Sequence, residues 1–445
     1  MVYGSKTINH KQFRSFPNYP TLCVMHRYSI QKLDSGLPVL TAPSDGTASV
    51  TVMVFAGAGS RYEKQSERGI SHFLEHMFFK GGKKYKNTKE VSMAIDAVGG
   101  EFNAFTGKEY AGYYVKVASE HLKLGCDVLG DMLCHASFPP EEIEKERGVI
   151  IEEDRMYQDT PMYRAGWDFE ELLFGDHPLG WDTIGTHKLI KSVTQKDFQD
   201  YKALLYTPDN LVITFAGKIT DKEALQLAEK HFGSLGGKKK RVFPALDAYG
   251  TEKVFLRTKK TEQSHLVLGA PGVGSQDPMH FAHKVLAVIL GGNMSSRMFL
   301  NIREAKGMCY YIDTEVDSYM DAGSIATRAG IDQSRLEEAI KLIIDEYDKV
   351  TDDGVLEEEV DRAKSFLRGK ITLSLEDTEE LAHFYGKQQL LYPEVRDVKE
   401  YMKRIDAVTK KDVDALARRL LTHRNLRLAV IGNTKDKDGL EALLA

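Results

Sequence analysis

The sequence predicts an α+β protein of two similar domains related by duplication, each a mainly antiparallel sheet with helices packed on it. The chain has 445 residues, more than one hydrophobic core normally serves. Strand-like and helix-like segments follow one order in the first half, and that order returns in the second. Matching segments lie a little over two hundred residues apart. One example is the pair of glycines that follows a helical pattern in each half, Gly81-Gly82 and Gly291-Gly292. A constant interval of this kind indicates duplication of one unit.

The first half begins with clear strand and helix patterns. Val50 to Phe55 is a β-branched run before a glycine-rich turn, which predicts a strand. Arg68 to Phe79 carries apolar residues at intervals of three and four, which predicts a buried helix. The further expected elements are the helix Thr88 to Val98, the strands Phe102 to Thr106 and Ala111 to Val117, the helices His121 to His135, Pro140 to Tyr157 and Ser192 to Tyr206, the strand Leu211 to Ala216 and the helix Asp221 to Phe232.

The second half repeats this series. Its expected elements are the strands Lys253 to Arg257 and Ser264 to Leu268, the helix Met279 to Leu290, the strand Ile325 to Gly330 and the helices Ser334 to Val350 and Glu357 to Leu373. We therefore expect a first domain over residues 28–235, a linker over 236–250 and a second domain over 251–445.

Two polar segments lie outside these elements. Residues 1–27 have no strand or helix pattern, so we expect an N-terminal extension, with Met25 as an alternative start. The basic run Lys238-Lys239-Lys240-Arg241 follows two glycines and is interpreted as a solvated part of the linker.

Composition excludes several classes of protein. Sixty Lys and Arg face sixty-five Asp and Glu, for a net charge of −5, so we expect no nucleic acid and no membrane surface as partner. No long apolar span is present, and the four cysteines form no CxxC pair. Scattered cysteines favour a reducing compartment, and a cytoplasmic location is the resulting expectation.

The segment His72-Phe73-Leu74-Glu75-His76 carries the strongest chemical signal. On a helix, two histidines four residues apart project from one face, so both imidazoles can reach one ion. Glu75 lies on the same side, where a carboxylate can take a proton from a water at that ion. This is the HxxEH motif of inverted zincins. The ordinary alternative is a pair of core or surface histidines on an amphipathic helix.

Catalytic zinc commonly binds two histidines and one carboxylate, so an acid from another helix is expected. The candidates lie in the segment Glu146-Arg147-Gly148-Val149-Ile150-Ile151-Glu152-Glu153. Its apolar residues indicate a buried helix, and carboxylates on a buried helix are costly unless a cation lies nearby. This donor set suits zinc, with cobalt and manganese as alternatives.

The HxxEH motif and this segment together resemble the pitrilysin or insulinase family of zinc metallopeptidases. In that family a helix with the pattern ER-x-V-I-x-x-E ends in the third zinc ligand, which implies that Glu153 is the ligand and that Glu146 supports the site. The adjacent Glu152 is the alternative ligand. The resemblance extends from about Tyr28 to the C-terminus and is closest to two-domain bacterial members similar to mitochondrial processing peptidase. Further matching segments are Phe78-Phe79-Lys80-Gly81, Gly100-Glu101-Phe102-Asn103-Ala104-Phe105-Thr106, His177-Pro178-Leu179-Gly180 and Tyr206-Thr207-Pro208-Asp209-Asn210-Leu211.

The resemblance also implies residues that meet the substrate. The strand with Asn103 and Ala104 corresponds to an edge beside the metal, to which a peptide can add by backbone hydrogen bonds. Arg303 and Tyr310, seven residues apart, match a pair that reaches the active site from the opposite half in complete relatives. Their guanidinium and hydroxyl groups are suitable donors for an oxyanion. The ordinary alternatives are a turn residue at Asn103, a surface arginine and a tyrosine at the start of a strand.

We therefore expect a zinc metalloendopeptidase that hydrolyses peptides or unfolded segments within an enclosed chamber. Its one Zn²⁺ per chain would be bound by His72, His76 and Glu153, with Glu75 as general base. Because the second half lacks HxxEH but carries Arg303 and Tyr310, we expect a homodimer whose second domains complete the partners' sites. The alternative is a non-catalytic structural or regulatory subunit of the same fold.

Overall fold

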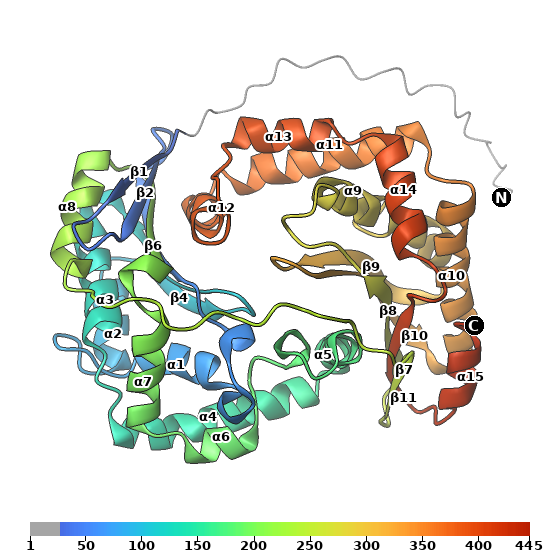
Figure 1. Ribbon diagram of the computed structural model, residues 1–445, viewed down its shortest axis with the longest axis horizontal. Coiled ribbons are helices and arrows are strands. Elements are labelled where there is room, and N and C mark those ends of the chain that lie inside the picture. The colour runs from blue at the N-terminus through green and yellow to red at the C-terminus, as the bar shows by residue number, and fades with distance from the viewer. Residues whose placement is uncertain (1–26) are drawn as a thin grey trace, which may run out of the picture.

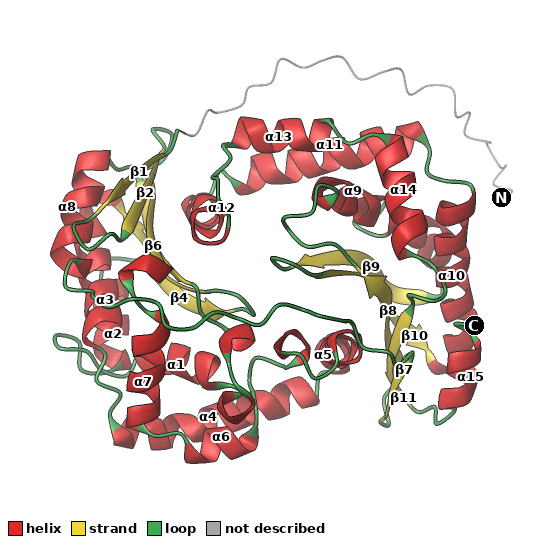
Figure 2. Cartoon of the chain, in the orientation of Figure 1, coloured by secondary structure: helices red, strands yellow, loops and turns green. Residues whose placement is uncertain are grey.

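Two β-sheets, each with helices on its outer side, face each other across the middle of the molecule (Figures 1 and 2). The computed structural model describes residues 27–445, so all of the expected N-terminal extension except residue 27 lies outside the described residues. The sheet of the first half lies on the left of Figure 1 and the sheet of the second half on the right.

The first sheet has six strands in the order β1-β2-β6-β3-β5-β4. Strands β2 and β6 run parallel, and the other neighbours are antiparallel. Strand β4 is an edge, paired on one side only with β5. The strands are β1 (Ser29–Lys32), β2 (Pro38–Pro43), β3 (Ser49–Ala56), β4 (Glu101–Thr106), β5 (Ala111–Ala118) and β6 (Leu211–Gly217).

The second sheet repeats this topology without a counterpart of β1. Its order is β7-β11-β8-β10-β9, with β7 and β11 parallel and the rest antiparallel. Strand β9 is the edge that corresponds to β4. The strands are β7 (Val254–Thr258), β8 (Gln263–Pro271), β9 (Cys309–Ser318), β10 (Gly323–Asp332) and β11 (Arg427–Gly432). The matching strand orders confirm the predicted α+β class with two similar units.

The helices follow the same repeat. Those of the first half are α1 (Ile70–Phe78), α2 (Thr88–Asp96), α3 (Leu122–His135), α4 (Pro140–Gln158), α5 (Pro161–Phe174), α6 (His187–Ser192), α7 (Gln195–Leu205) and α8 (Asp221–Phe232). Those of the second half are α9 (His280–Leu290), α10 (Leu336–Asp352), α11 (Glu357–Ser374), α12 (Thr378–Leu391), α13 (Val398–Asp406), α14 (Lys410–Leu420) and α15 (Lys437–Ala442).

The two halves exchange equivalent helices. Helix α5 of the first half packs on β8 and β11 of the second sheet, burying Phe169 and Leu173 against Val267. Helix α12 of the second half packs on β3 and β6 of the first sheet, burying Leu381 with Phe55. Each sheet is therefore covered on one face by its own helices and on the other by a helix from the opposite half.

Gly386 permits the close approach of α12 to the first sheet. A Cβ atom at this position would lie 2.1 Å from a ring carbon of Phe55 and 2.5 Å from the Thr214 hydroxyl oxygen. Since real Cβ atoms do not approach other atoms so closely, a larger residue would push the helix away from the sheet.

Two local expectations can be compared with the structure. The helix expected over Ser192 to Tyr206 is α7, which begins at Gln195 because Thr194 caps it in a capping box with Asp197. The basic run after Gly237 is not simply solvated, since Arg241 forms an ion pair with Glu67 at 2.5 Å. The linker thus packs along the first half.

Two further findings bear on the domain and location predictions. No helix or strand occurs between Phe232 and Val254 in the described chain. The domain boundaries and the linker over 236–250 stay a prediction. No helix within residues 27–445 combines the length and apolarity needed to cross a bilayer.

Candidate metal centre

Helices α1 and α4 bring three candidate ligands together. His72 and His76 project from the same face of α1, with their Nε2 atoms 3.3 Å apart. Helix α4 packs against α1 and places Glu153 Oε2 3.7 Å from His72 Nε2 and 3.6 Å from His76 Nε2. The three ligand atoms all lie within 4.8 Å of one another.

The donor set fits a zinc ion. Two imidazole nitrogens and one carboxylate oxygen are the ligands of many catalytic zinc sites, in which a fourth position is left for water. His76 Nδ1 lies 2.9 Å from Glu146 Oε1, and a proton on Nδ1 would leave the Nε2 lone pair directed at the cluster. Within the described residues, no other group of His, Cys, Asp and Glu side chains meets the geometry of a metal site.

Glu146 and Lys80 stabilise His76 on the side of the ring that faces away from the cluster. Glu146 is buried on α4 and also forms an ion pair with Lys80, whose Nζ lies 2.6 Å from Glu146 Oε2. Burial alone would raise the pKa of Glu146, but its hydrogen bonds to His76 and Lys80 hold the pKa below its usual value. Glu146 therefore stays ionised and can orient the imidazole.

The two histidines differ in their surroundings. Burial, together with a smaller effect of the neighbouring His76, lowers the pKa of His72 to about 3. Burial also acts to lower the pKa of His76, but its hydrogen bond to Glu146 and the nearby carboxylates outweigh burial and raise the pKa above its usual value. His72 is thus a neutral imidazole, the form that binds metals.

Glu75 lies beside the cluster, where its carboxylate accepts a hydrogen bond from the Thr106 hydroxyl at the end of β4. Burial raises the pKa of Glu75, the Thr106 hydrogen bond and His76 lower it, Glu153 raises it, and the net change is upward. A carboxyl group with a raised pKa is better matched to accepting and returning a proton near neutral pH.

The structure distinguishes the two adjacent acids on α4. Glu153 faces the histidines, whereas the Glu152 side chain is exposed and paired with Arg155. Burial raises the pKa of Glu153, and His76 offsets part of this rise. The geometry therefore favours Glu153 over Glu152 as a ligand.

The predicted substrate residues lie on two separate elements. Asn103 and Ala104 are on β4, and the Ala104 amide donates to Asn103 Oδ1 at 2.9 Å. Arg303 lies in the short helix Phe299–Glu304 and Tyr310 on β9, where 78% of Tyr310 is exposed. Within residues 27–445, no hydrogen bond or ion pair joins Arg303 or Tyr310 to the three clustered side chains.

Three supporting residues were not found from the sequence. Thr106 and Lys80 were quoted only as parts of matching segments, although Lys80 follows His76 by four residues, a spacing that could have indicated a shared face. Glu63 accepts hydrogen bonds from the amides of Gly69 and Ser71, each at 2.8 Å, and so caps the start of α1. Nothing local in the sequence marks that cap, because it precedes the helix by a loop.

Comparison with known proteins agrees with this fold and this cluster. Residues 39–186 match the insulinase (peptidase family M16) model, and residues 192–367 match the model of the peptidase M16 inactive domain. The chain is 36% identical to the uncharacterized zinc protease YmxG of Bacillus subtilis over 399 residues, covering 90% of this chain and 96% of that protein. It is also 36% identical to an uncharacterized zinc protease of Streptomyces coelicolor over 412 residues, covering 91% and 89% respectively.

Solved structures share the fold at lower identity. A protease from Helicobacter pylori superposes with a TM-score of 0.83 at 20% identity, covering 92% of this chain and all of that one (100%). A chain of complex III from Candida albicans superposes with a TM-score of 0.81 at 18% identity, covering 94% of this chain and 99% of that one.

The fold of two similar units and the cluster of two histidines and one glutamate are together typical of a class of peptidases. The chain belongs to the insulinase family, peptidase family M16. This confirms the resemblance drawn from the sequence and the expectation of a metallopeptidase. The names of the relatives and the two-histidine, one-glutamate cluster both support zinc, whereas one ion per chain stays a prediction.

Proposed function

We propose that this chain is a metalloendopeptidase that hydrolyses peptides or unfolded segments within an enclosed chamber, with one zinc ion bound by His72, His76 and Glu153. The observation that carries the proposal is the convergence of these three ligand atoms within 4.8 Å of one another. Zinc bound there would lower the pKa of a water molecule and polarise the carbonyl of the peptide bond to be cleaved.

Glu75 would act as the general base and general acid of the reaction. Its carboxylate, held by the Thr106 hydroxyl, would accept the proton from the attacking water and later return it to the leaving amine. Its raised pKa supports the first of these steps, because a stronger base than an ordinary carboxylate accepts the proton more readily.

The substrate would bind in an extended conformation along β4. This strand has an unpaired edge, and Asn103 and Ala104 lie on it, three and two residues before Thr106. A peptide that used the Ala104 amide would first displace the Asn103 side chain that now accepts from it. Arg303 and Tyr310, supplied by the second half of a partner chain in a homodimer, would donate hydrogen bonds to the developing oxyanion.

A non-catalytic subunit of the same fold is the second candidate. The similarity to a chain of complex III favours it, since that similarity extends over 94% of this chain. At 18% identity this similarity concerns the fold alone. The intact cluster beside Glu75 supports the peptidase instead.

Removal and restoration of the metal tests the proposal. A fluorogenic peptide should be cleaved by the purified chain, cleavage should stop after treatment with a chelator, and stoichiometric zinc should restore it. Cleavage that continues in the metal-free protein would contradict the proposal, as would a zinc-loaded protein that cleaves no peptide from a diverse library.

Glu75→Gln tests the proton acceptor. The variant should keep its zinc, because Glu75 is not among the three clustered ligands, but lose peptide hydrolysis by roughly 10²–10⁴-fold. Metal content and turnover are measured on the same preparation. Glu152→Gln is the matched control and should keep both, since Glu152 is exposed and faces away from the cluster.

A further inference from the structure

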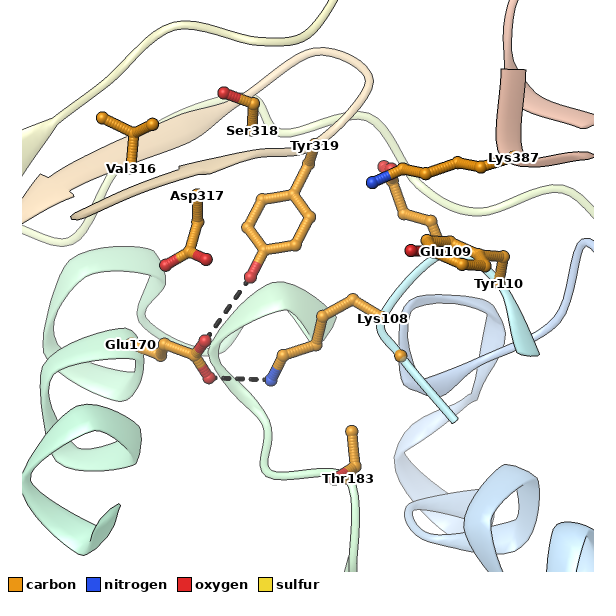
Figure 3. A pocket seen from close by; sticks show the side chains of 11 residues that line it. Lys108, Glu109, Tyr110, Glu170, Thr183, Val316, Asp317, Ser318, Tyr319 and Lys387 are labelled. Carbon is orange, nitrogen blue, oxygen red and sulfur yellow. Dashed lines mark hydrogen bonds and ion pairs between the residues drawn. The ribbon is translucent and has the colours of Figure 1, made fainter. Parts of the chain in front are cut away.

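A cavity of about 370 Å³ with several charged side chains in its walls lies between the two halves, and none of its lining residues belongs to the metal cluster (Figure 3). The turn from β4 to β5 forms one wall, and the tip of the β9–β10 hairpin forms another. Helices α5 and α12, the two exchanged helices, contribute Glu170 and Lys387. The volume is at the small end of the range of ligand pockets, about 300–1,000 Å³.

Lys387 brings an unpaired positive charge to this cavity. Its ammonium group lies 5.0 Å from the centre of the Tyr110 ring, and no carboxylate of the described residues forms an ion pair with it. Burial acts to lower the pKa of Lys387, but the neighbouring tyrosines raise it above its usual value, so the group stays charged. A partly buried charge without a counter-ion is costly, and an anionic ligand group would remove that cost.

The opposite wall carries an excess of negative charge. Asp317 of β9 and Glu170 of α5 point toward each other across this side of the cavity (Figure 3). Lys108 pairs with Glu170 at 2.9 Å. Asp317 accepts a hydrogen bond from Ser324 at 3.2 Å, and among residues 27–445 it has no ion-pair partner. Glu170 also accepts from the Tyr319 hydroxyl at 3.4 Å and lies within the influence of the Arg328 charge, whereas Asp317 has no cationic partner of its own among the described residues.

The remaining acid in the wall has an arginine partner. Glu109 pairs with the fully buried Arg61 at 2.6 Å and accepts the Met320 amide at 3.0 Å. Arg61 also pairs with Asp321 at 2.7 Å. This network ties the two hairpin tips together, and Lys387 and Asp317 are the charged lining residues that form no ion pair within residues 27–445.

We propose that this cavity is a binding site for a small zwitterion of the amino acid or short peptide class. The ligand carboxylate would pair with Lys387, and the ligand ammonium group would pair with Asp317 and Glu170. Because the walls come from both halves, the bound ligand would link them. The site does not depend on the metal or on the proposed hydrolysis.

Calorimetric titration of the full-length, metal-loaded chain with glycine, diglycine and triglycine tests the proposal and measures the spacing of the two charges. One member of the series should bind with a dissociation constant of about 1 mM or lower. Lys387→Met and Asp317→Asn should each weaken that binding by roughly tenfold or more, as expected for a lost charge-assisted contact. Both changes remove a charge from a cavity wall and should leave the chain folded.

Capped ligands identify which end meets which residue. Amidation of the ligand carboxylate should weaken binding to the unaltered chain but cause little further loss in Lys387→Met. Acetylation of the amine should behave in the same way with Asp317→Asn. Lys399→Met, at an exposed position on α13, is the matched control and should not change the affinity.

Three outcomes would overturn the proposal. They are a dissociation constant above about 10 mM for all three ligands, equal binding by the chain and both cavity variants, and loss of binding on addition of a chelator, which would place the ligand at the metal centre. Binding that survives the chelator and fails in both variants would support the cavity site even if the chain proved not to be a peptidase.

Discussion

Both ring nitrogens of His76 have a polar neighbour. Its Nδ1 faces Glu146, which is itself paired with Lys80, and its Nε2 faces His72 and Glu153. The chain of contacts from Lys80 to the cluster fixes the ring orientation before any metal binds. Preorganisation of this kind reduces the entropy that a metal site loses on binding.

Substitution of the two adjacent acids on α4 tests the ligand assignment at this scale. Glu153→Gln should weaken zinc binding by more than the roughly 10–100-fold seen for changes behind a metal ligand, because it removes a charged ligand atom. Glu152→Gln should bind zinc as the unaltered chain does. Competition with a chromogenic chelator measures both affinities, and equal affinities would contradict the assignment.

Buried histidines in the second half create a pH dependence of stability. His283 on α9 is fully buried, and within the described residues neither of its ring nitrogens has a hydrogen-bond partner. Burial lowers its pKa to about 3, from the value of about 6.5 that is usual for histidine. The unfolded chain therefore binds more protons than the folded chain between these two values, and the folded state loses stability as the pH falls through this window.

His283→Leu should remove this loss. At pH 7 we expect the variant to differ from the unaltered chain by less than about 1.5 kcal/mol, because the volumes are similar and no hydrogen bond is lost. Below pH 6.5 its stability relative to the unaltered chain should improve by up to about 1.4 kcal/mol per pH unit. Urea unfolding at pH 7 and pH 5 measures the difference, and parallel stability curves would contradict it.

At the scale of elements, the exchanged helices couple the two halves. Helix α5 belongs to the first half by sequence but fills a core on the second sheet, and α12 does the reverse. Each half would expose a sheet face if it were separated from the other. We therefore expect the halves to unfold together.

Phe169→Ala tests this coupling. Phe169 is 3% exposed on α5 and lies in the core of the second sheet, so its loss should cost about 3–5 kcal/mol. Hydrogen exchange should then accelerate in β8 and β11, far along the chain from the substitution. Leu373→Ala, at a site that is 68% exposed, is the control and should change stability by less than about 0.5 kcal/mol. Faster exchange confined to the first half would contradict the coupling.

At the scale of the whole molecule, the proposed active site would need residues from both halves. The cluster and Glu75 lie in the first half. Arg303 and Tyr310 lie in the second half and form no hydrogen bond or ion pair with the cluster among the described residues. A homodimer would bring them together by symmetry, with each second half completing the partner's site.

Mixing two inactive variants tests this arrangement. Glu75→Gln and Tyr310→Phe should each be nearly inactive alone, since each homodimer lacks one group at every site. After exchange of subunits, a mixed dimer contains one site with both an intact Glu75 and an intact Tyr310, so roughly a quarter of the total sites should recover activity. Peptide cleavage is followed over time, and a mixture that stays inactive after proven subunit exchange would contradict completion by the partner.

Local sequence patterns determined the duplicated α+β architecture and the histidine motif. Apolar spacing placed α1 and α4, and the four-residue interval placed His72 and His76 on one face, because helical geometry depends only on near neighbours. The interval between Gly81-Gly82 and Gly291-Gly292 indicated the duplication. The third ligand was expected at Glu153 from the family pattern, and the orientation of α4 agrees with that choice over Glu152.

Only the tertiary structure decided how distant segments meet. The exchange of α5 and α12, the hydrogen bond from the Thr106 hydroxyl to Glu75, and the cavity between Lys387 and Asp317 join residues far apart along the chain. Such contacts depend on how whole elements pack, and nothing in the spacing of nearby residues specifies them. Periodicity therefore determined which helices and strands form, whereas the burial of their apolar faces against one another decided which charged groups share a site.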